Sequence, residues 1–206
     1  YYDAPYTIGS KTFRNWWNSS YGFQGYHNIR EGIIYSMNVI AVRCLMETIT
    51  PQLGIEYAEN MGITSLVKED LGAATALGGI TKGVSNLELT AAYATIANGG
   101  GYTKPRFDTK ILDHDGKVLI DNGPETRQVL KDSTAFLLTD ALSESMKSNR
   151  LYARPGISIN STSTRAALTG MSAAGKSGTT TSNNDIWFVG YTPYYTCLLY
   201  TSPSPR

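Results

Sequence analysis

The chain has 206 residues, 41% of them hydrophobic, which is enough to bury the core of one globular domain. Its 18 basic and 17 acidic residues nearly cancel, which excludes the strong positive face of a nucleic-acid-binding protein or a polybasic membrane patch. No run approaches the ~18 apolar residues of a membrane span. Cys44 and Cys197 are far apart, and His27 and His114 are isolated, so we expect no metal site and no cofactor.

The first 25 residues carry scattered aromatic side chains, among them Trp16 and Trp17, and show no sustained period. This composition predicts a loop. The aromatic side chains either line a groove or, as is commoner, cover an underlying core.

Asn28 can cap a short helix over residues 29–35, and a second helix begins near Asn38. Val39, Val42, Met46 and Ile49 form one apolar stripe on the second helix. Ser36-Met37 is then the joint, and Ser36 and Asn38, two positions apart in a turn, can project into the same cleft. The alternative is that both residues only cap a helix.

Three further helices are predicted by caps followed by apolar stripes. They begin at Thr50-Pro51, at Ser85 with Glu88 as a capping box, and at Asp132 or Ser133. Their stripes are Leu53, Tyr57 and Met61; Leu89, Tyr93, Ile96 and Ala97; and Ala135, Leu138, Ala141, Leu142 and Met146. Gly62 ends the first of these helices, and Gly99 to Gly101 end the second.

Asp115-Gly116 lies between two apolar runs and predicts a hairpin over residues 110–120 that projects from the domain. Residues 148–169 are polar and irregular, which predicts a surface loop. Ser65 and Lys68 form a Ser-x-x-Lys pattern, which on a helix would bring a nucleophile and a base together. Because it follows a helix end and runs into acidic residues, we interpret it as a charged surface turn.

Residues 174–180 read Ala-Gly-Lys-Ser-Gly-Thr-Thr and combine one cation with three hydroxyls and two glycines. Lys176 offers a compact charge, and the hydroxyls of Ser177, Thr179 and Thr180 can donate to an anion. The glycines suit a strand edge that another backbone approaches closely. The pattern therefore indicates a carboxylate site, with a bland Ser/Gly-rich turn as the alternative. Residues 173–181 are expected to pair antiparallel with a buried strand at residues 186–191, through a turn at Asn183-Asn184.

Ser36-Met37-Asn38 followed by Lys176-Ser177-Gly178-Thr179 resembles the second and third motifs of penicillin-binding transpeptidases and serine β-lactamases. The resemblance is closest to class A, bifunctional penicillin-binding proteins, and spans about residues 16–195. Its supporting flanks are residues 36–43, 76–79, 93–101 and 185–193. It implies an α+β fold in which an antiparallel sheet packs against helices.

The resemblance also implies an activity, in which a serine attacks a D-alanyl-D-alanine stem peptide of peptidoglycan and passes the acyl group to another stem's amine. By that resemblance, Ser36 relays a proton to the leaving amine and Asn38 holds the donor peptide's amide. Lys176 favours the deprotonated relay and attracts the terminal carboxylate. Ser177, Gly178, Thr179 and Thr180 form the substrate-binding strand, with the Thr179 N–H as an oxyanion donor.

The partners implied are stem peptides and β-lactam antibiotics, with no nucleic acid. The implied location is the extracytoplasmic face of a bacterial membrane, reached only through an anchor outside this chain. The family's first motif, Ser-x-x-Lys with the nucleophile, does not precede Ser36. We therefore expect residues 1–195 to be a partial transpeptidase domain whose nucleophile lies before Tyr1, so that this fragment alone is inactive.

The last residues, 196–206, include Pro203 and Pro205, which are incompatible with a further interior strand. We expect a non-native or disordered tail there. Two other functions share the motifs: a penicillin-sensing binding domain and, with less support, a serine β-lactamase. No glutamate-bearing loop resembling that of class A β-lactamases lies between Asn38 and Lys176.

Overall fold

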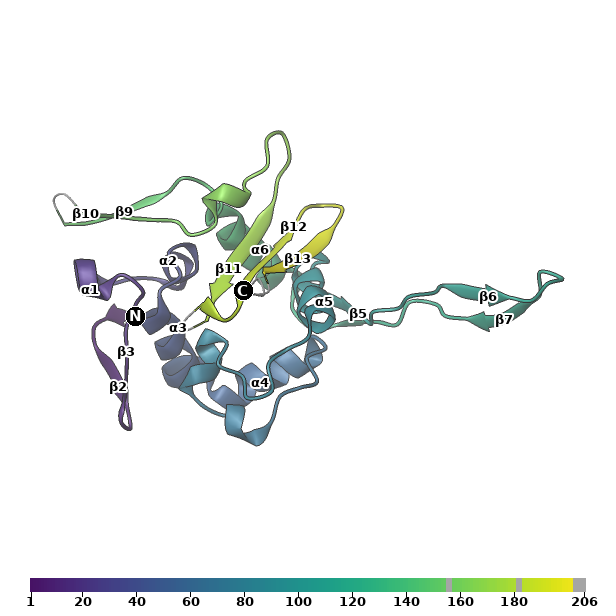
Figure 1. The fold of residues 1–206 in the computed structure, drawn as a ribbon, viewed down its shortest axis with the longest axis horizontal. Helices are drawn as coiled ribbons and strands as arrows, with labels where there is room; N and C mark the ends of the chain where they lie inside the picture. Colours follow the sequence, from purple (N-terminus) through teal and green to yellow (C-terminus); the bar gives the residue numbers. More distant parts are fainter. Residues whose placement is uncertain (155–156, 181–182, 202–206) are drawn as a thin grey trace, which may run out of the picture.

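A computed structural model describes residues 1–154, 157–180 and 183–201. Its centre is an antiparallel sheet of three strands in the order β11-β12-β13 (Figure 1). The bounds are Ala174–Thr179 for β11, Ile186–Tyr191 for β12 and Thr196–Thr201 for β13. Two helices pack against the sheet, α6 (Asp132–Glu144) against β11 and α5 (Asn86–Ala97) against β12 and β13. The expected α+β architecture is confirmed.

The pairing of β11 with β12 is the one expected, with Lys176 opposite Val189. Asn183 has φ of 56°, as its place in the turn requires. β12 is the interior strand, and Val189 and Tyr191 are buried, but Ile186 is exposed.

The absence of a strand after Tyr195 was a wrong expectation. Thr196 to Thr201 pair with β12 in full register, and the two prolines lie beyond this strand, outside the described residues. Leu198 is buried, and this apolar burial stabilises β13. The prolines that follow the strand do not prevent it from forming.

α5 (Asn86–Ala97) and α6 (Asp132–Glu144) form the predicted pair of long helices. Ser85 and Glu88 make the reciprocal bonds of a capping box, as predicted. The N-cap position of α6 is Lys131, not Asp132 or Ser133 as predicted, and the Lys131 side chain makes no capping hydrogen bond. Ile96 and Leu142 join Ala174 and Tyr191 in one core cluster beneath the sheet.

α2 (Ile29–Ile34) and α3 (Asn38–Arg43) meet at the predicted joint, and α3 continues as a π-helical segment, Cys44–Ile49. Asn28 caps α2 with a full capping box. Val39 and Val42 are buried, whereas Ile49 at the end of the predicted stripe is exposed.

α4 (Pro51–Asn60) begins at Thr50-Pro51 as predicted, with the Thr50 hydroxyl accepting the Leu53 N–H. Its predicted inward stripe is wrong, because Leu53 and Tyr57 are exposed. Short 3₁₀ turns follow at Lys68–Asp70 and Ala73–Leu77.

The first 25 residues are more regular than predicted. β1 (Tyr2–Asp3) pairs with β4 (Gly25–Tyr26), β2 (Tyr6–Ile8) pairs with β3 (Lys11–Phe13), and α1 spans Asn18–Tyr21. Gly9 and Ser10 form the two-residue turn between β2 and β3, and Gly9 takes the positive φ of 59° that such a turn requires. Phe13 and Trp17 are buried, which confirms the core-covering reading for them, while Trp16 is half-exposed.

Residues 148–169 were expected to form a surface loop, which is also wrong in part. β9 (Arg150–Arg154) and β10 (Ile157–Asn160) form a hairpin, followed by a 3₁₀ turn at Thr164–Ala166. Ile159 is buried in a second core cluster with Trp17, Tyr35 and Met37. A few apolar side chains, such as that of Ile159, pack this polar segment against the core. The overall composition of the segment did not predict that packing.

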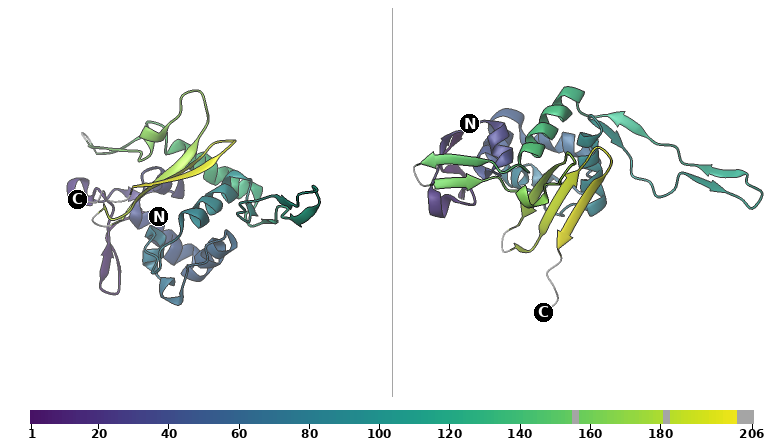
Figure 2. Two further views of the ribbon diagram at one scale, coloured as in Figure 1. Left: turned by 45° about the vertical axis from the view of Figure 1, so that its right-hand side comes forward. Right: turned by 90° about the horizontal axis from the view of Figure 1, so that it is seen from above.

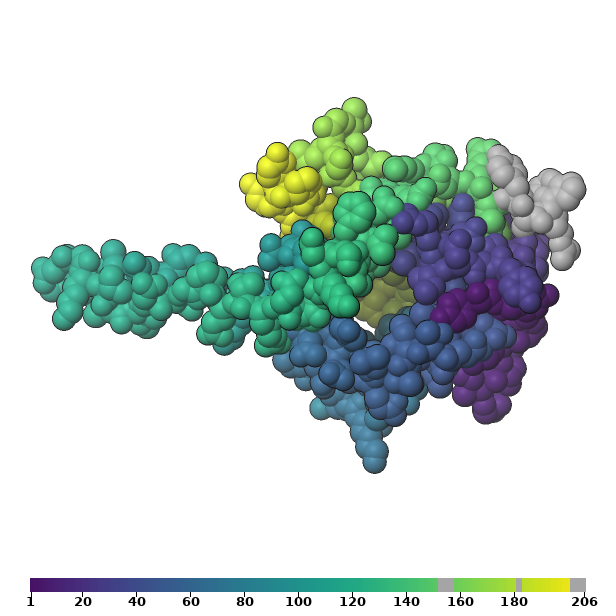
Figure 3. Space-filling view, turned by 180° about the vertical axis from the view of Figure 1, so that it is seen from behind, coloured from purple at the N-terminus to yellow at the C-terminus, as the bar shows by residue number. Residues whose placement is uncertain are grey.

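A long arm leaves the body, as predicted for the Asp115-Gly116 hairpin (Figures 1 and 3). β5 (Gly101–Thr103) and β8 (Thr126–Gln128) form its base, and β6 (Lys110–Leu112) pairs with β7 (Val118–Asp121) beyond it. Figure 2 shows the arm pointing away from the three-stranded sheet. In the described part of the chain, every helix is too short or too polar to cross a bilayer.

Candidate active site

The turn between α2 and α3 holds Ser36 in a left-handed conformation, with φ of 53°. The Met37 N–H donates back to the Gly32 carbonyl at 2.8 Å, as in a Schellman helix end. Glycine is the usual residue at such a position, and a side chain there costs about 1 kcal/mol. Contacts from elsewhere in the fold must therefore hold this serine in place.

The Ser36 hydroxyl lies against Lys176, although 140 positions separate the two residues. Lys176 Nζ donates to Ser36 Oγ at 3.0 Å and to the Ser177 carbonyl at 2.9 Å. The ammonium is thus fixed between the α2–α3 turn and its own strand. Since Ser36 Oγ accepts this bond, the hydroxyl's own proton is free to be donated to a third group.

Lys176 is partly buried, and burial lowers its pKa to about 8. Desolvation disfavours the charged form of a lysine, which is the direction seen here. Since this pKa still lies above 7, the protonated form of Lys176 predominates at neutral pH. Lys176 is therefore a cation at pH 7 that can lose its proton at little cost.

Among the described residues, β11 pairs with β12 and with no other strand, so the outer side of β11 is an open strand edge there. The Thr180 N–H donates to the Asp185 carbonyl at 3.0 Å, which fixes the alternation of backbone groups along the strand. By that alternation, the N–H and C=O groups of Gly175, Ser177 and Thr179 point away from β12. This edge can accept an extended peptide backbone.

Two side chains already occupy part of that edge. The Ser145 hydroxyl, fully buried at the end of α6, donates to the Gly175 carbonyl at 2.9 Å and also lies 2.8 Å from the Leu142 carbonyl. Lys176 occupies the Ser177 carbonyl. The edge is therefore tied to α6 at one end and open toward Thr179 at the other.

The four predicted substrate-binding residues differ in their surroundings. Gly178 and Thr179 are exposed, Ser177 is partly buried, and a Cβ at Gly178 would meet open space. Thr180 is engaged locally, since its hydroxyl accepts the Asp185 N–H at 2.8 Å. Thr180 thus closes the β11–β12 connection, while Ser177 and Thr179 remain the carboxylate candidates.

Asn38 does not cap its own helix, because Met37 is the residue before α3 and gives no side-chain cap. Its amide nitrogen donates to the Arg14 carbonyl at 3.0 Å. The helix-capping alternative is therefore wrong for the Asn38 side chain, and the Ser36 hydroxyl contacts Lys176, although the Ser36 backbone lies in the turn that ends α2. No contact between Asn38 and Lys176 is recorded among the described residues, so the approach of Asn38 to Lys176 stays a prediction.

The Ser65 pattern is a surface turn, as interpreted. Residues 63–67 have no regular structure, and the Ser65 hydroxyl donates to the Gly83 carbonyl. Ser65 and Lys68 do not share a helix, which removes the geometry that a nucleophile and base would need.

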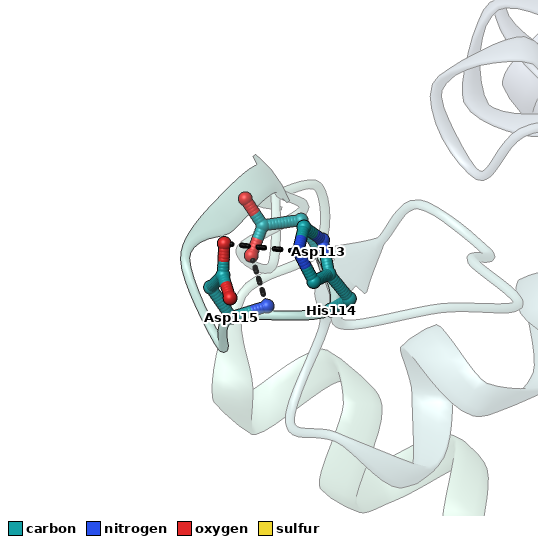
Figure 4. Close-up of side chains that lie close together, drawn as sticks. All are labelled: Asp113, His114 and Asp115. Carbon is teal, nitrogen blue, oxygen red and sulfur yellow. Dashed lines mark hydrogen bonds and ion pairs between the residues drawn. The ribbon is translucent and has the colours of Figure 1, made fainter.

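The arm tip brings Asp113, His114 and Asp115 close together (Figure 4). These are neighbours in an exposed turn: the Asp113 carboxylate accepts the N–H groups of Asp115 and Lys117, and His114 Nε2 lies 3.1 Å from Asp115. The carboxylate is used to close the turn, so the cluster has an ordinary structural explanation. A hollow of about 230 Å³ at the arm's base, lined by residues such as Arg106 and Phe107, also lies apart from Lys176.

The structure thus sets an edge strand reading Lys-Ser-Gly-Thr against a Ser-x-Asn turn in an α+β fold, which brings together the two motifs on which the resemblance rested. The family described as penicillin-binding protein transpeptidase domain matches residues 1–197, and the chain belongs to it. The resemblance found in the sequence is confirmed.

The relatives are class A penicillin-binding proteins. Penicillin-binding protein 1A of Clostridium botulinum is 34% identical over 185 residues, covering 89% of this chain and 21% of that protein. Penicillin-binding protein 1A/1B of Bacillus subtilis is 29% identical over 216 residues, covering 97% and 22%. The chain thus spans about a fifth of the length of these relatives.

Solved structures show the same fold. Penicillin-binding protein 1A from Haemophilus influenzae superposes with a TM-score of 0.75 at 24% identity, covering 93% of this chain and 32% of that chain. PonA1 from Mycobacterium tuberculosis in complex with penicillin V superposes with a TM-score of 0.74 at 25% identity, covering 97% and 53%.

Proposed function

We propose that the chain carries the proton-relay and carboxylate-binding part of a serine D,D-transpeptidase that cross-links peptidoglycan. The observation that carries this proposal is the 3.0 Å hydrogen bond from Lys176 Nζ to Ser36 Oγ beside an open strand edge. Family membership supports the acyl-transfer chemistry. The setting we propose is the extracytoplasmic face of a bacterial membrane.

In the proposed reaction, the D-alanyl-D-alanine end of a stem peptide lies along β11. Its terminal carboxylate is bound by the hydroxyls of Ser177 and Thr179 and attracted by the Lys176 charge. Asn38 would hold the donor peptide's amide, and the Thr179 N–H, which faces the open edge, is placed to stabilise an oxyanion.

A nucleophilic serine attacks the penultimate carbonyl, an ester forms, and the terminal D-alanine leaves with a proton. Ser36 delivers that proton, because its hydroxyl accepts from Lys176 and donates onward. The amine of a second stem then attacks the ester, which forms the cross-link and restores the serine. We assign the nucleophile to no residue of this site, since the single Ser-x-x-Lys pattern, at Ser65, lies in a surface turn.

A β-lactam imitates the D-alanyl-D-alanine end and would occupy the same strand. The direct test is an NMR titration of the 206-residue chain with an N-acylated D-Ala-D-Ala peptide. We expect shifts at the amides of Ser177 and Thr179 and at the Lys176 side chain, with arm residues such as Ile111 unmoved. Equal shifts with the L-Ala-L-Ala peptide, or none at β11, would contradict the proposal.

A further inference from the structure

Three consecutive residues, Arg14 to Trp16, hold the turn that presents Ser36. The Arg14 carbonyl accepts from the Asn38 amide at 3.0 Å, and Asn15 Oδ1 accepts the Val39 N–H at 3.0 Å. Trp16 Nε1 donates to the Tyr35 carbonyl at 3.1 Å. The residues on both sides of Ser36 are thus bonded to one segment that lies 19 to 24 positions earlier in the chain.

Asn15 supplies what α3 lacks. The residue before the helix, Met37, has no polar side chain to bond the first free N–H groups. Val39 is fully buried, so water cannot satisfy its N–H, and Asn15 Oδ1 does so instead. Asn15 is therefore a helix cap contributed from another part of the chain.

Asp3 fixes the orientation of Asn15. It is a buried carboxylate with 1% exposure, and its Oδ1 accepts from Asn15 Nδ2 at 2.8 Å. Its Oδ2 accepts the Gln24 N–H at 2.9 Å. Because the NH₂ group of Asn15 donates to Asp3, the side-chain oxygen of Asn15 faces the start of α3.

We propose that Asn15, oriented by Asp3, is a positioning residue that keeps Ser36 in its left-handed conformation within reach of Lys176. A non-glycine residue with positive φ persists only where surrounding contacts over-determine it, and these hydrogen bonds are those contacts. The geometric part stands on the structure alone, and its consequence for proton relay rests on the proposed function.

The test exchanges the two side chains. Asn15→Asp sets two buried carboxylates against each other, and Asp3→Asn leaves one acceptor too few for Asn15 and Gln24. The double variant Asp3→Asn with Asn15→Asp can remake every bond. Donor and acceptor are reversed only between residues 3 and 15, while the Gln24 and Val39 N–H groups still donate to side-chain oxygens. The exchange also places the carboxylate at the α3 N-terminus, where a negative charge is favourable.

The readouts are the NMR titration of Lys176 and the backbone chemical shifts of Ser36, which report φ. In Asn15→Ala and in both single exchanges, we expect the Lys176 pKa to rise by about half a unit or more as water reaches the amine, and the Ser36 shifts to lose their left-handed signature. The double variant should return both readouts to those of the original chain.

Ser85→Ala is the matched control, since it also removes a side-chain cap from a helix N-terminus, that of α5. It should lower the melting temperature and leave Lys176 and Ser36 unchanged. If Asn15→Ala behaves like Ser85→Ala, or if the double variant is no better than the singles, Asn15 is only structural and the inference is overturned. Failure of the D-Ala-D-Ala titration would instead remove the proposed function and leave these readouts to decide the positioning.

Discussion

The Ser36 turn and the tip of the β6–β7 arm are both built on a residue with positive φ, 53° at Ser36 and 81° at Gly116. At the arm tip that residue is a glycine, and the turn closes on itself through bonds to Asp113. At the site it is a serine, held by residues far away in the chain. At the arm tip, glycine adopts the positive φ without strain. At the site a hydroxyl is needed, so a serine takes the strained conformation and contacts from the rest of the fold hold it there.

The largest effect is expected from Lys176→Ala. In a form of the protein that a fluorescent penicillin acylates, labelling should slow on the order of a hundredfold or more, because a positioned charge beside the relay is lost. Lys110→Ala in the arm removes the same charge from an exposed pair with Asp121 and should change nothing measurable. Similar labelling rates for Lys176→Ala and Lys110→Ala would contradict a special role for the charge beside Ser36.

The pH dependence of Lys176 gives the next largest effect. Its pKa is lowered to about 8, so the cation is present below that pH and is lost as pH rises through it. Binding of a D-Ala-D-Ala peptide should then weaken by up to about tenfold per pH unit above 8.

The same lowered pKa predicts how folding stability changes with pH. In the unfolded chain Lys176 titrates near 10.4, so the free energy of unfolding should rise between about pH 8 and 10.5. A titration midpoint above 10 for Lys176 in the folded chain would contradict its burial.

Substitutions at Ser36 separate strain from chemistry. Ser36→Gly relieves the left-handed backbone and should be about 1 kcal/mol more stable than Ser36→Ala in urea unfolding. Both lack the hydroxyl, so both should lose the relay to the same degree. A Ser36→Ala variant as stable as Ser36→Gly would show that the backbone has moved out of the left-handed region.

The smallest effect is expected at Gly116. Gly116→Ala introduces the same kind of backbone strain, but the arm can open alone, so the free energy of global unfolding should change by less than about 0.5 kcal/mol. Amide hydrogen exchange should speed up in β6 and β7 and stay unchanged in β11. A large global loss would mean that the arm is coupled to the body.

The features predicted best from the sequence are those that residues close together in the chain determine. The helix cap at Asn28, the capping box at Ser85, the Thr50-Pro51 helix start and the Asp115-Gly116 hairpin are each set by residues within a few positions of one another. The meeting of Ser36 with Lys176 was expected from the family's motifs, since neither pattern by itself specifies a partner 140 residues away.

The sequence could not show the contacts that make the site rigid. Arg14, Asn15 and Trp16 lie in a segment predicted as loop, and Ser145 ends a helix without any motif. Their role depends on which buried N–H or C=O group lies opposite them. Stripe arguments failed at Leu53 and Tyr57 for a similar reason, because an apolar stripe does not specify whether another element covers it.

The unpaired side of β11 has a consequence for solution behaviour. A bare strand edge offers its N–H and C=O groups to any extended chain, including another copy of the same protein, and lysine is one of the residues that discourages such pairing. Lys176 occupies the Ser177 carbonyl and so blocks part of this edge. Removing that lysine unblocks a template for self-association as well as the relay. The Lys176→Ala protein therefore has to be shown monomeric by sedimentation before its lost labelling is credited to catalysis.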